Sequence, residues 1–311
     1  MKEAFRTKLG ANLAGRERLE EVNLIIEEYQ AEGYSLTLRQ LYYQLVSRGI
    51  IPNEQKEYAK LSTLLVKGRM AGLVDWDAIE DRIRVPYLPY CVKDPQDALQ
   101  DTIGTYRLNR QKGQEVYLEL WVEKDALSGI LKRVTSEFHI PLVVNRGYSS
   151  CSAMYDAFKR FDKAIRKNQT VCLLYLGDHD PSGLDMIRDI KVRITEFLCS
   201  WKLKNFLERK GRLEEKLEDL FTIKHLGLTQ DQINKFNPPP NPAKISDPRA
   251  KWYIEKFGET SWEVDALDPK TLTKLVTLNI QDLIDKDKFH NICQREEYEI
   301  EILEKVAEDI R

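Results

Sequence analysis

The stretch from Val171 to Asp185 constrains the fold more than any other part of the 311-residue chain. Its apolar run, residues 171–176, is typical of a buried strand that ends at Gly177, and a helical pattern resumes soon afterwards. Asp178 and Asp180 follow this strand directly and, being two residues apart, point to the same side. Ligands of open α/β sheets bind at the carboxyl ends of the strands, so the stretch predicts a functional, acidic edge.

Two carboxylates held close together repel each other unless a cation lies between them. Hard oxygen ligands favour Mg²⁺, with Mn²⁺ as the second choice. An isolated Asp-X-Asp motif is more often a solvated acidic turn, in which Asp180-Pro181 merely starts the next helix. The residues upstream decide between these two interpretations.

A second strand with an acid at its end is predicted upstream. Residues 116–122 read as a strand that ends in Glu123-Lys124, and helices and strands then alternate as far as residue 176. The β-α-β-α-β-α order predicts an α/β fold with a parallel, doubly wound sheet. Glu123, Asp178 and Asp180 then meet at one edge of the sheet, and three converging acids favour a divalent metal over a structural role. The helices between the strands are expected at residues 126–138 and 152–165, around a strand at 140–144.

The N-terminal part has a different pattern. Apolar spacing predicts helices over residues 17–32, 38–48 and 54–70, and residues 73–85 alternate as a short hairpin would. Three helices followed by a hairpin are the pattern of a winged helix-turn-helix.

The second of these helices carries two adjacent tyrosines that differ in their expected environment. Tyr42 falls inside the apolar arc of the helical wheel and is expected in the core. Tyr43 falls outside it, on the same face as Arg39 one turn earlier, and is expected to present its hydroxyl. A phenol beside a guanidinium can attack a phosphate that the arginine holds. The alternative is a surface tyrosine whose ring lies on an arginine.

The third helix has one basic and one apolar face. Its basic stripe consists of Lys56, Lys60, Thr63 and Lys67, and Arg69, Arg82 and Arg84 are expected to extend it. Such a stripe on a helix-turn-helix favours contact with a DNA backbone over an ordinary solvated face. Lysines position a protein on DNA but do not read its sequence.

Composition limits the remaining possibilities. The net charge of −2 requires any DNA binding to come from a local basic face. No apolar run is long enough for a membrane span, and no signal-peptide pattern is present, so a cytoplasmic, nucleoid-associated protein without membrane contact is expected. Five scattered cysteines without a CxxC spacing favour a reducing compartment and argue against a zinc site.

These motifs together resemble a known family. A Glu ending one strand and an Asp-X-Asp that runs into Asp-Pro-X-Gly are similar to the TOPRIM domain. Preceded by a winged helix that contains an RxxYY motif, Arg39-Gln40-Leu41-Tyr42-Tyr43, the chain resembles the A subunit of topoisomerase VI and its meiotic double-strand-break relatives. The resemblance covers about residues 35–270 and is to the compact, stand-alone "mini-A" members. It implies a winged-helix (CAP-like) domain at 1–90, a linker at 91–113, a TOPRIM domain at 114–270 and a helical packing or dimerisation element at 271–311.

The resemblance also implies roles for individual residues. Tyr43 corresponds to the nucleophile that forms a 5′-phosphotyrosyl link, and Arg39 to the arginine before it. Glu123, Asp178 and Asp180 correspond to the Mg²⁺ ligands, and Lys124 matches the family's Glu-Lys pair and is expected to contact DNA.

The implied partners are double-stranded DNA and a second copy of the chain, with Tyr43 of one protomer facing the acids of the other. Since the sequence has no Gly-rich ATP-binding loop, strand passage would need a separate ATPase B-type subunit. Little sequence precedes Tyr43, unlike in the longer A subunits. Some plasmid-defence relatives hydrolyse DNA with the metal site alone, so a TOPRIM nuclease without a covalent tyrosine is one alternative. A DNA-binding protein with a structural cation is another.

Three later features carry weaker expectations. The proline-rich residues 237–244 predict an extended strap. Residues 261–269 alternate like a strand, with Glu263 and Asp265 on one face. His179 is expected to be an exposed loop residue.

Overall fold

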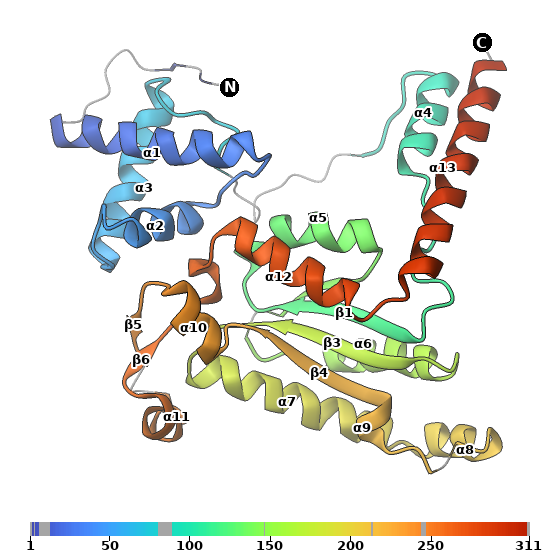
Figure 1. Cartoon of the computed structure of the whole chain (residues 1–311). Coiled ribbons are helices and arrows are strands. Elements are labelled where there is room, and N and C mark those ends of the chain that lie inside the picture. The colour runs from blue at the N-terminus through green and yellow to red at the C-terminus, as the bar shows by residue number, and fades with distance from the viewer. Residues whose placement is uncertain are drawn as a thin grey trace.

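The computed structural model describes an α/β protein with three parts. A helical N-terminal region precedes a four-stranded parallel sheet flanked by helices, and a long helix lies at the C-terminal end (Figure 1). The described residues are 2, 4–5, 13–79, 89–145, 147–212, 214–243 and 247–309.

The three predicted N-terminal helices are confirmed as α1 (Leu13–Ala31), α2 (Leu38–Ser47) and α3 (Gln55–Met70). A capping box starts α2, in which the side chain of Thr37 and the side chain of Gln40 each accept a hydrogen bond from the other residue's backbone N–H. Apolar residues at helical spacing bury one face of each helix in a shared core, which includes Leu19, Val22, Ile25, Leu41, Leu45, Leu61 and Leu65.

The predicted hairpin after α3 is absent from the part of it that the structure describes. Residues 73–79 form turns and bends, and Ile79 makes only an isolated bridge with Leu36. The Arg69 guanidinium donates to the carbonyl oxygens of Trp76 (2.7 Å) and Ile79 (2.6 Å), which fixes this segment without strand pairing. The rest of the predicted hairpin, with Arg82 and Arg84, lies outside the described residues.

The predicted parallel sheet is confirmed, and it has one strand more than expected. Its strands run in the order β2 (Leu142–Val144), β1 (Val116–Val122), β3 (Thr170–Leu176) and β4 (Phe221–Gly227). All three pairings are parallel, so the carboxyl ends of the strands lie along one edge. The sequence analysis missed β4.

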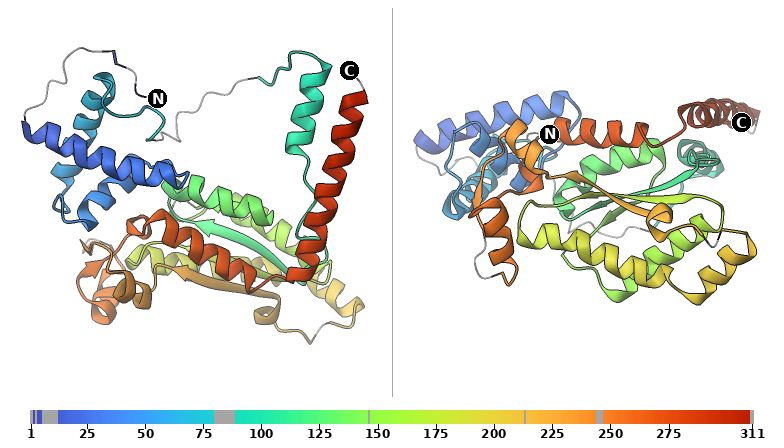
Figure 2. Two further views of the ribbon diagram at one scale, coloured as in Figure 1. Left: turned by 45° about the horizontal axis from the view of Figure 1, so that its top comes forward. Right: turned by 60° about the horizontal axis from the view of Figure 1, so that its bottom comes forward.

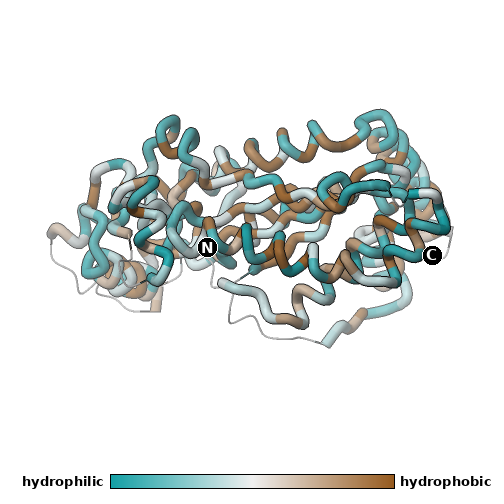
Figure 3. Tube along the Cα trace, turned by 90° about the horizontal axis from the view of Figure 1, so that it is seen from below, coloured by the Kyte–Doolittle hydropathy of each residue, from teal (hydrophilic) through white to brown (hydrophobic). Residues whose placement is uncertain are grey.

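Each face of the sheet is covered by two helices (Figure 2). Leu118, Leu120 and Val122 pack with α5 (Ser128–Phe138) and α12 (Pro269–Gln281). Trp121 packs on the opposite face with α6 (Cys151–Ile165) and α7 (Pro181–Leu198). Burial on both faces explains the nearly continuous apolar strands, whose hydrophobic colour gathers at the centre of Figure 3.

The predicted linker contains a helix. Asp94 caps α4 (Pro95–Thr105), and α4 packs against α13 (Lys286–Asp309), so the two form an arm at one end of the molecule (Figure 1). The expected C-terminal helical element is therefore two helices, of which α12 covers the sheet and α13 belongs to the arm. No described helix has both the length and the apolar character to cross a membrane.

The predicted strand over residues 261–269 is wrong. Only Thr260–Ser261 form a strand, β6, which pairs with β5 (Asn241–Pro242) in the proline-rich strap, and Val264–Ala266 then turn as a 3₁₀ helix, η2. Val264 and Ala266 are both buried. These two apolar residues on either side of Asp265 gave the sequence the alternating pattern of a strand. The remaining elements are η1 (Asp125–Leu127), α8 (Trp201–Arg209), α9 (Leu217–Leu220), α10 (Gln230–Phe236) and α11 (Ala250–Phe257).

Candidate active site at the carboxyl edge of the sheet

The ends of β1 and β3 bring two of the predicted acids together. The backbone N–H of Asp178 donates to Oε2 of Glu123 at 3.1 Å, and the backbone N–H of Val264 donates to Oδ1 of Asp178 at 2.9 Å. A β-carbon at Gly177 would lie 2.6 Å from the Tyr175 ring and 3.2 Å from the Glu123 carboxylate. Glycine therefore allows the chain to turn tightly between the strand and the acids.

Burial disfavours the charged forms of both acids. Burial raises the pKa of Glu123 to about 7, and the neighbouring charge of Asp178 adds to the rise. Burial also raises the pKa of the Asp178 carboxyl, although Lys124 opposes it. Carboxylates whose charged forms are disfavoured in this way are poised to take up a cation or a proton.

Lys124 lies inside this group of acids, and the structure does not place it with the basic face of α3. Its ammonium lies 2.8 Å from Oδ2 of Asp178 and 3.1 Å from Oε2 of Glu263. The lysine thus bridges the end of β3 to the segment before η2, and its charge partly compensates both carboxylates.

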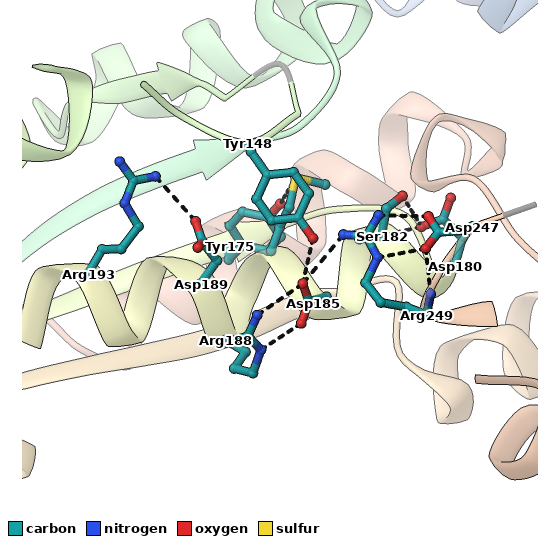
Figure 4. Close-up of polar contacts among 12 residues, drawn as sticks. Tyr148, Tyr175, Asp180, Ser182, Asp185, Arg188, Asp189, Arg193, Asp247 and Arg249 are labelled. Carbon is teal, nitrogen blue, oxygen red and sulfur yellow. Dashed lines mark hydrogen bonds and ion pairs between the residues drawn. The ribbon is translucent and has the colours of Figure 1, made fainter. Parts of the chain in front are cut away.

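Asp180 points toward a helix N-terminus. Its Oδ1 accepts hydrogen bonds from the backbone N–H of Gly183 (2.6 Å) and the hydroxyl of Ser182 (2.9 Å), which caps α7 (Figure 4). A β-carbon at Gly183 would lie 2.3 Å from the carbonyl oxygen of Asp178, which accounts for the glycine of the motif. Among the described residues, no group of three or more His, Cys, Asp or Glu side chains is arranged to hold a metal ion.

Arg39 joins the site from α2. Its guanidinium pairs with Glu263, and its Nε lies 2.7 Å from Oδ2 of Asp265. Asp265 is 1% exposed, and neither of its carboxylate oxygens has a hydrogen-bond partner among the described residues. Glu263 and Asp265 do share a face, as the sequence predicted, but that face belongs to a turn. We call the group formed by Glu123, Asp178, Glu263 and Asp265 the acid cluster.

Tyr43 is buried, which contradicts its expected outward position. It is 4% exposed, its ring centroid lies 5.7 Å from the Arg39 guanidinium carbon, and its hydroxyl accepts a hydrogen bond from Asn241 at 3.5 Å. Burial, followed by the charge of Asp265, raises the pKa of Tyr43 to about 12. The cause is tertiary packing, because α2 contacts η2 and Ala266 joins the N-terminal core. Tyr43 thus lies beside the acids of its own chain, whereas the resemblance implies those of a partner.

Two asparagines connect the tyrosine helix to the proline-rich strap. As expected, Tyr42 is buried; its hydroxyl donates to Oδ1 of Asn53 at 3.0 Å. The amide of Asn53 donates to Oδ1 of Asn241 and to the carbonyl oxygen of Pro240, both at 2.8 Å. The sequence analysis missed both asparagines, since no periodicity marks a contact between positions this far apart.

The predicted basic stripe of Lys56, Lys60, Thr63 and Lys67 lies on the exposed face of α3. Lys60, Thr63 and Lys67 line a groove of about 810 Å³ between α1 and α3, together with Arg18. Lys56 and Lys60 pair with nearby glutamates of the same segment. Arg69 differs, because its bonds to two carbonyl oxygens commit it to the segment after α3.

His179 is buried rather than exposed. Its Nδ1 lies 2.8 Å from the Tyr253 hydroxyl, and its ring contacts those of Phe257 and Trp262. The backbones of His179 and Trp262 exchange two hydrogen bonds. This bridge holds Glu263 beside the end of β3, so the histidine has a structural role between the two aspartates.

A cluster around Asp185 was also missed. The Tyr148 hydroxyl (2.5 Å), Arg188 (2.6 Å) and Arg249 (3.4 Å) all contact the Asp185 carboxylate, one turn beyond the start of α7 (Figure 4). The cluster gathers two cations near the N-terminal end of α7, which Asp180 caps. The only sequence signal was the Gly-Tyr-Ser-Ser segment after β2.

Five of the predicted residues therefore converge around the acid cluster, namely Arg39, Tyr43, Glu123, Lys124 and Asp178, with Asp180 adjacent. No protein-family model matches the chain, and no curated protein matches its sequence.

Proposed function

We propose that this chain is a DNA-cleaving enzyme that combines a winged-helix DNA-binding domain with a TOPRIM domain, in the manner of a compact topoisomerase VI A subunit. The observation that carries the proposal is the contact between α2 and η2, which inserts Arg39 and Tyr43 into the acid cluster of the same chain. A structural role alone does not require a phenol, a guanidinium and several underpaired carboxylates at the carboxyl edge of a parallel sheet.

Three of the predicted acids carry the oxygen atoms that a divalent cation prefers, although no three acids of the described residues are gathered around one point. Glu123, Asp178 and Asp180 offer hard oxygen ligands, and burial raises the pKa values of the Glu123 and Asp178 carboxyls, so that a bound cation would stabilise their charged forms. Asp265 adds a buried carboxylate whose ion-pair partner is Arg39. Mg²⁺ or Mn²⁺ held by the first three residues would supply the charge that a phosphodiester and its leaving oxygen require.

The protein's own groups take the remaining roles. The Arg39 guanidinium exchanges Glu263 for a non-bridging phosphate oxygen and holds the phosphate beside Tyr43. The Tyr43 hydroxyl oxygen attacks phosphorus, the bond from phosphorus to the 3′-oxygen breaks, and a 5′-phosphotyrosyl link forms. Its proton must first leave a phenol whose pKa is about 12, and Asp265, whose charge acts on that phenol, is the candidate acceptor. Lys60 and Lys67 on α3 contact the DNA backbone.

A second reaction is favoured by the burial of Tyr43. A phenol that is 4% exposed and bonded to Asn241 also suits a positioning role, in which it orients Arg39 while water attacks the phosphate. The chain would then be a TOPRIM nuclease that hydrolyses DNA.

Plasmid cleavage separates these reactions. Supercoiled plasmid is incubated with the protein and Mg²⁺ or Mn²⁺, quenched with detergent, and analysed with and without protease. The variants are Tyr43→Phe and Asp178→Ala, and Tyr90→Phe is the control because Tyr90 is an exposed tyrosine whose hydroxyl donates to Asp101 of α4.

The proposed transesterification predicts protein trapped on 5′ ends by the wild type and by Tyr90→Phe, with loss in both other variants. Free ends produced equally well by Tyr43→Phe but not by Asp178→Ala would establish hydrolysis. If no form cuts in the presence or absence of an added ATPase subunit, while DNA binding persists, the chain is a DNA-binding protein whose acids hold a structural cation.

A further inference from the structure

Exposed aromatic rings gather where α6 meets the junction of α7 and α8. One face of α6, including Met154 and Phe161, packs on the sheet. A second stripe of the helix, at helical spacing, consists of Tyr155, Phe158, Lys159, Asp162 and Arg166. Tyr155 is 49% exposed, and Trp201 at the start of α8 is 68% exposed. Large rings that gather at one place on a surface indicate a binding site, whereas scattered single ones are ordinary.

These rings line a cavity of about 450 Å³ between α6 and the α7–α8 junction. The Phe158 ring stacks on that of Phe197 from α7 with centroids 5.5 Å apart, and the Tyr155 ring contacts both at 5.8 Å. Trp201 lines the same cavity from α8. The volume lies in the range of ligand cavities, and rings from separate helices suit a planar group such as a nucleobase.

A cation lies beside several of these rings. The pairs, with the distance from the cation to the ring centroid, are Lys159 and Tyr155 (5.3 Å), Lys202 and Trp201 (5.9 Å), and Arg166 and Phe206 (4.8 Å). A base that stacks on a ring brings its own phosphate with it, and that phosphate needs a cation within reach. The arrangement therefore suits nucleotides better than an apolar peptide.

Arg166 joins this cavity to a second one of about 830 Å³, because its side chain lines both. The second cavity contains two exposed lysines, Lys167 and Lys210, that have no ion pair with another described residue. Arg166 and Arg212 have surface ion pairs with acids, which a phosphate can replace. Six cations and four acids line the two cavities together, a local positive excess in a chain whose net charge is −2.

Both cavities lie at the end of α7 that is remote from the acid cluster. Asp180 caps the start of α7, and with 18 residues the helix is about 27 Å long. Figure 1 shows α8 at the opposite end of the molecule from α2. A ligand in these cavities is therefore separate from the acid cluster and from a duplex bound on α3.

We propose that the two cavities form a surface that binds single-stranded nucleic acid, with bases in the aromatic cavity and phosphates along the cation-lined one. Every base has an aromatic face and every link has a phosphate, so this recognition does not depend on sequence. Bases inside a duplex are stacked on each other and are not free to enter the aromatic cavity. The inference does not depend on the proposed DNA cleavage.

Fluorescence anisotropy of the full chain with labelled oligothymidylate and oligouridylate of about 20 nucleotides tests the surface, and the two strands distinguish DNA from RNA. Trp201→Ala is expected to raise the dissociation constant of the more tightly bound strand about tenfold, because a stacking ring is lost. Trp201→Phe keeps a ring and is expected to stay close to the wild type. Trp252→Ala is the matched control, since Trp252 of α11 is also exposed and has the Lys256 ammonium 5.6 Å from its ring centroid, but lines neither cavity.

Two further measurements separate stacking from charge. Lys210→Gln is expected to reduce the slope of log affinity against log salt by about 0.7, the value for one phosphate contact on a single strand. An abasic strand of the same length is expected to bind at least about tenfold more weakly, and Trp201→Ala should not weaken it further. A labelled duplex should bind the wild type and Trp201→Ala equally.

Strand binding that is equally tight in the wild type and in Trp201→Ala would refute the proposal. An abasic strand bound as tightly as oligothymidylate would show a surface that senses charge alone and would refute the stacking role. Loss of duplex affinity in Trp201→Ala would mean that the duplex covers this face. If neither strand binds the wild type at micromolar concentration, the aromatic cavity serves another partner, such as a protein, and the proposal is wrong.

Discussion

Two carboxylates four residues apart, the buried Glu119 on β1 and the partly buried Glu123 just after it, have opposite surroundings. Glu119, in the middle of the strand, has no exposed surface and accepts four hydrogen bonds. Its donors are the Tyr117 hydroxyl (2.8 Å), the Trp121 indole (2.9 Å) and two nitrogens of Arg160 (2.5 and 2.9 Å). Among the described residues, the Glu123 carboxylate accepts a hydrogen bond only from the Asp178 backbone.

The difference is between a carboxylate that the fold pairs fully and one that it leaves able to accept further ligands. A buried carboxylate with every lone pair occupied has nothing left to offer a ligand, and it ties a helix to a strand. Underpaired acids destabilise the fold when they are ionised, so retaining them requires a reason other than stability. Their partners Arg39 and Lys124 carry positive charge that a phosphate can attract.

Asp178→Asn tests this comparison with the largest expected effect. Asparagine keeps an acceptor for the Val264 backbone N–H and removes a charge that burial disfavours. We expect unchanged or higher stability toward urea, together with a loss of plasmid cleavage of about 1,000-fold or more.

The matched control is Asp156→Asn, at an exposed aspartate of α6 that pairs with Lys159. It is expected to keep both stability and cleavage. A strongly destabilised Asp178→Asn protein would show that the fold needs the charge of Asp178, as it needs that of Glu119.

Arg160→Leu tests the fully paired carboxylate, Glu119. It leaves Glu119 charged and buried with only two donors, and we expect a loss of about 3–5 kcal/mol in the free energy of unfolding, measured by urea denaturation. Glu119→Gln in the Arg160→Leu background removes the stranded charge and is expected to recover more than half of the loss. A cost below about 1 kcal/mol for Arg160→Leu would show that this ion pair is not structural.

The pH dependence of stability sharpens the comparison further. Folding raises the pKa of Glu123 from 4.5 to about 7, so the folded state binds more protons than the unfolded chain in this interval. The contribution of Glu123 to stability therefore falls as pH rises from about 4.5 to about 7, by on the order of 3 kcal/mol.

Urea denaturation of the wild type and of Glu123→Gln across this interval isolates that contribution. The decline should be absent from the variant, and Mg²⁺ should reduce it in the wild type by binding the ionised acids. Parallel pH profiles for the two proteins would refute the raised pKa.

Local patterns in the sequence were sufficient to predict much of this fold. Nearly continuous apolar runs marked β1 and β3, and Asp180-Pro181 marked the start of α7. The acids Glu123 and Asp178 could be placed together because parallel strands end at one edge. The strand β4 was missed because Lys224 and His225 interrupt its apolar pattern.

Tertiary contacts decided what the sequence did not reveal. Tyr43 falls outside the apolar arc of its own helix, and only the packing of α2 on η2 buries it. Likewise, the prolines near α4 suggested an irregular linker, although Asp94 and Pro95 form an ordinary helix start. Asn241 lies almost two hundred residues from Tyr43, beyond the reach of any local pattern.

The cations of α3 differ in the same way, because some have only surface ion pairs and one is bonded within the fold. Substitutions among them are expected to have the smallest effect. Lys56 and Lys60 are exposed, and their pairs with Glu54 and Glu57 are surface contacts that a phosphate can replace. We expect Lys60→Gln to weaken DNA binding severalfold and to reduce the slope of log affinity against log salt by about 1, measured by fluorescence anisotropy. Arg69→Gln should leave that slope unchanged and instead lower the free energy of unfolding by about 1–2 kcal/mol, because the carbonyl oxygens of Trp76 and Ile79 lose their donor. The reverse outcome, a changed slope for Arg69 and none for Lys60, would mean that the DNA meets α3 from its other side.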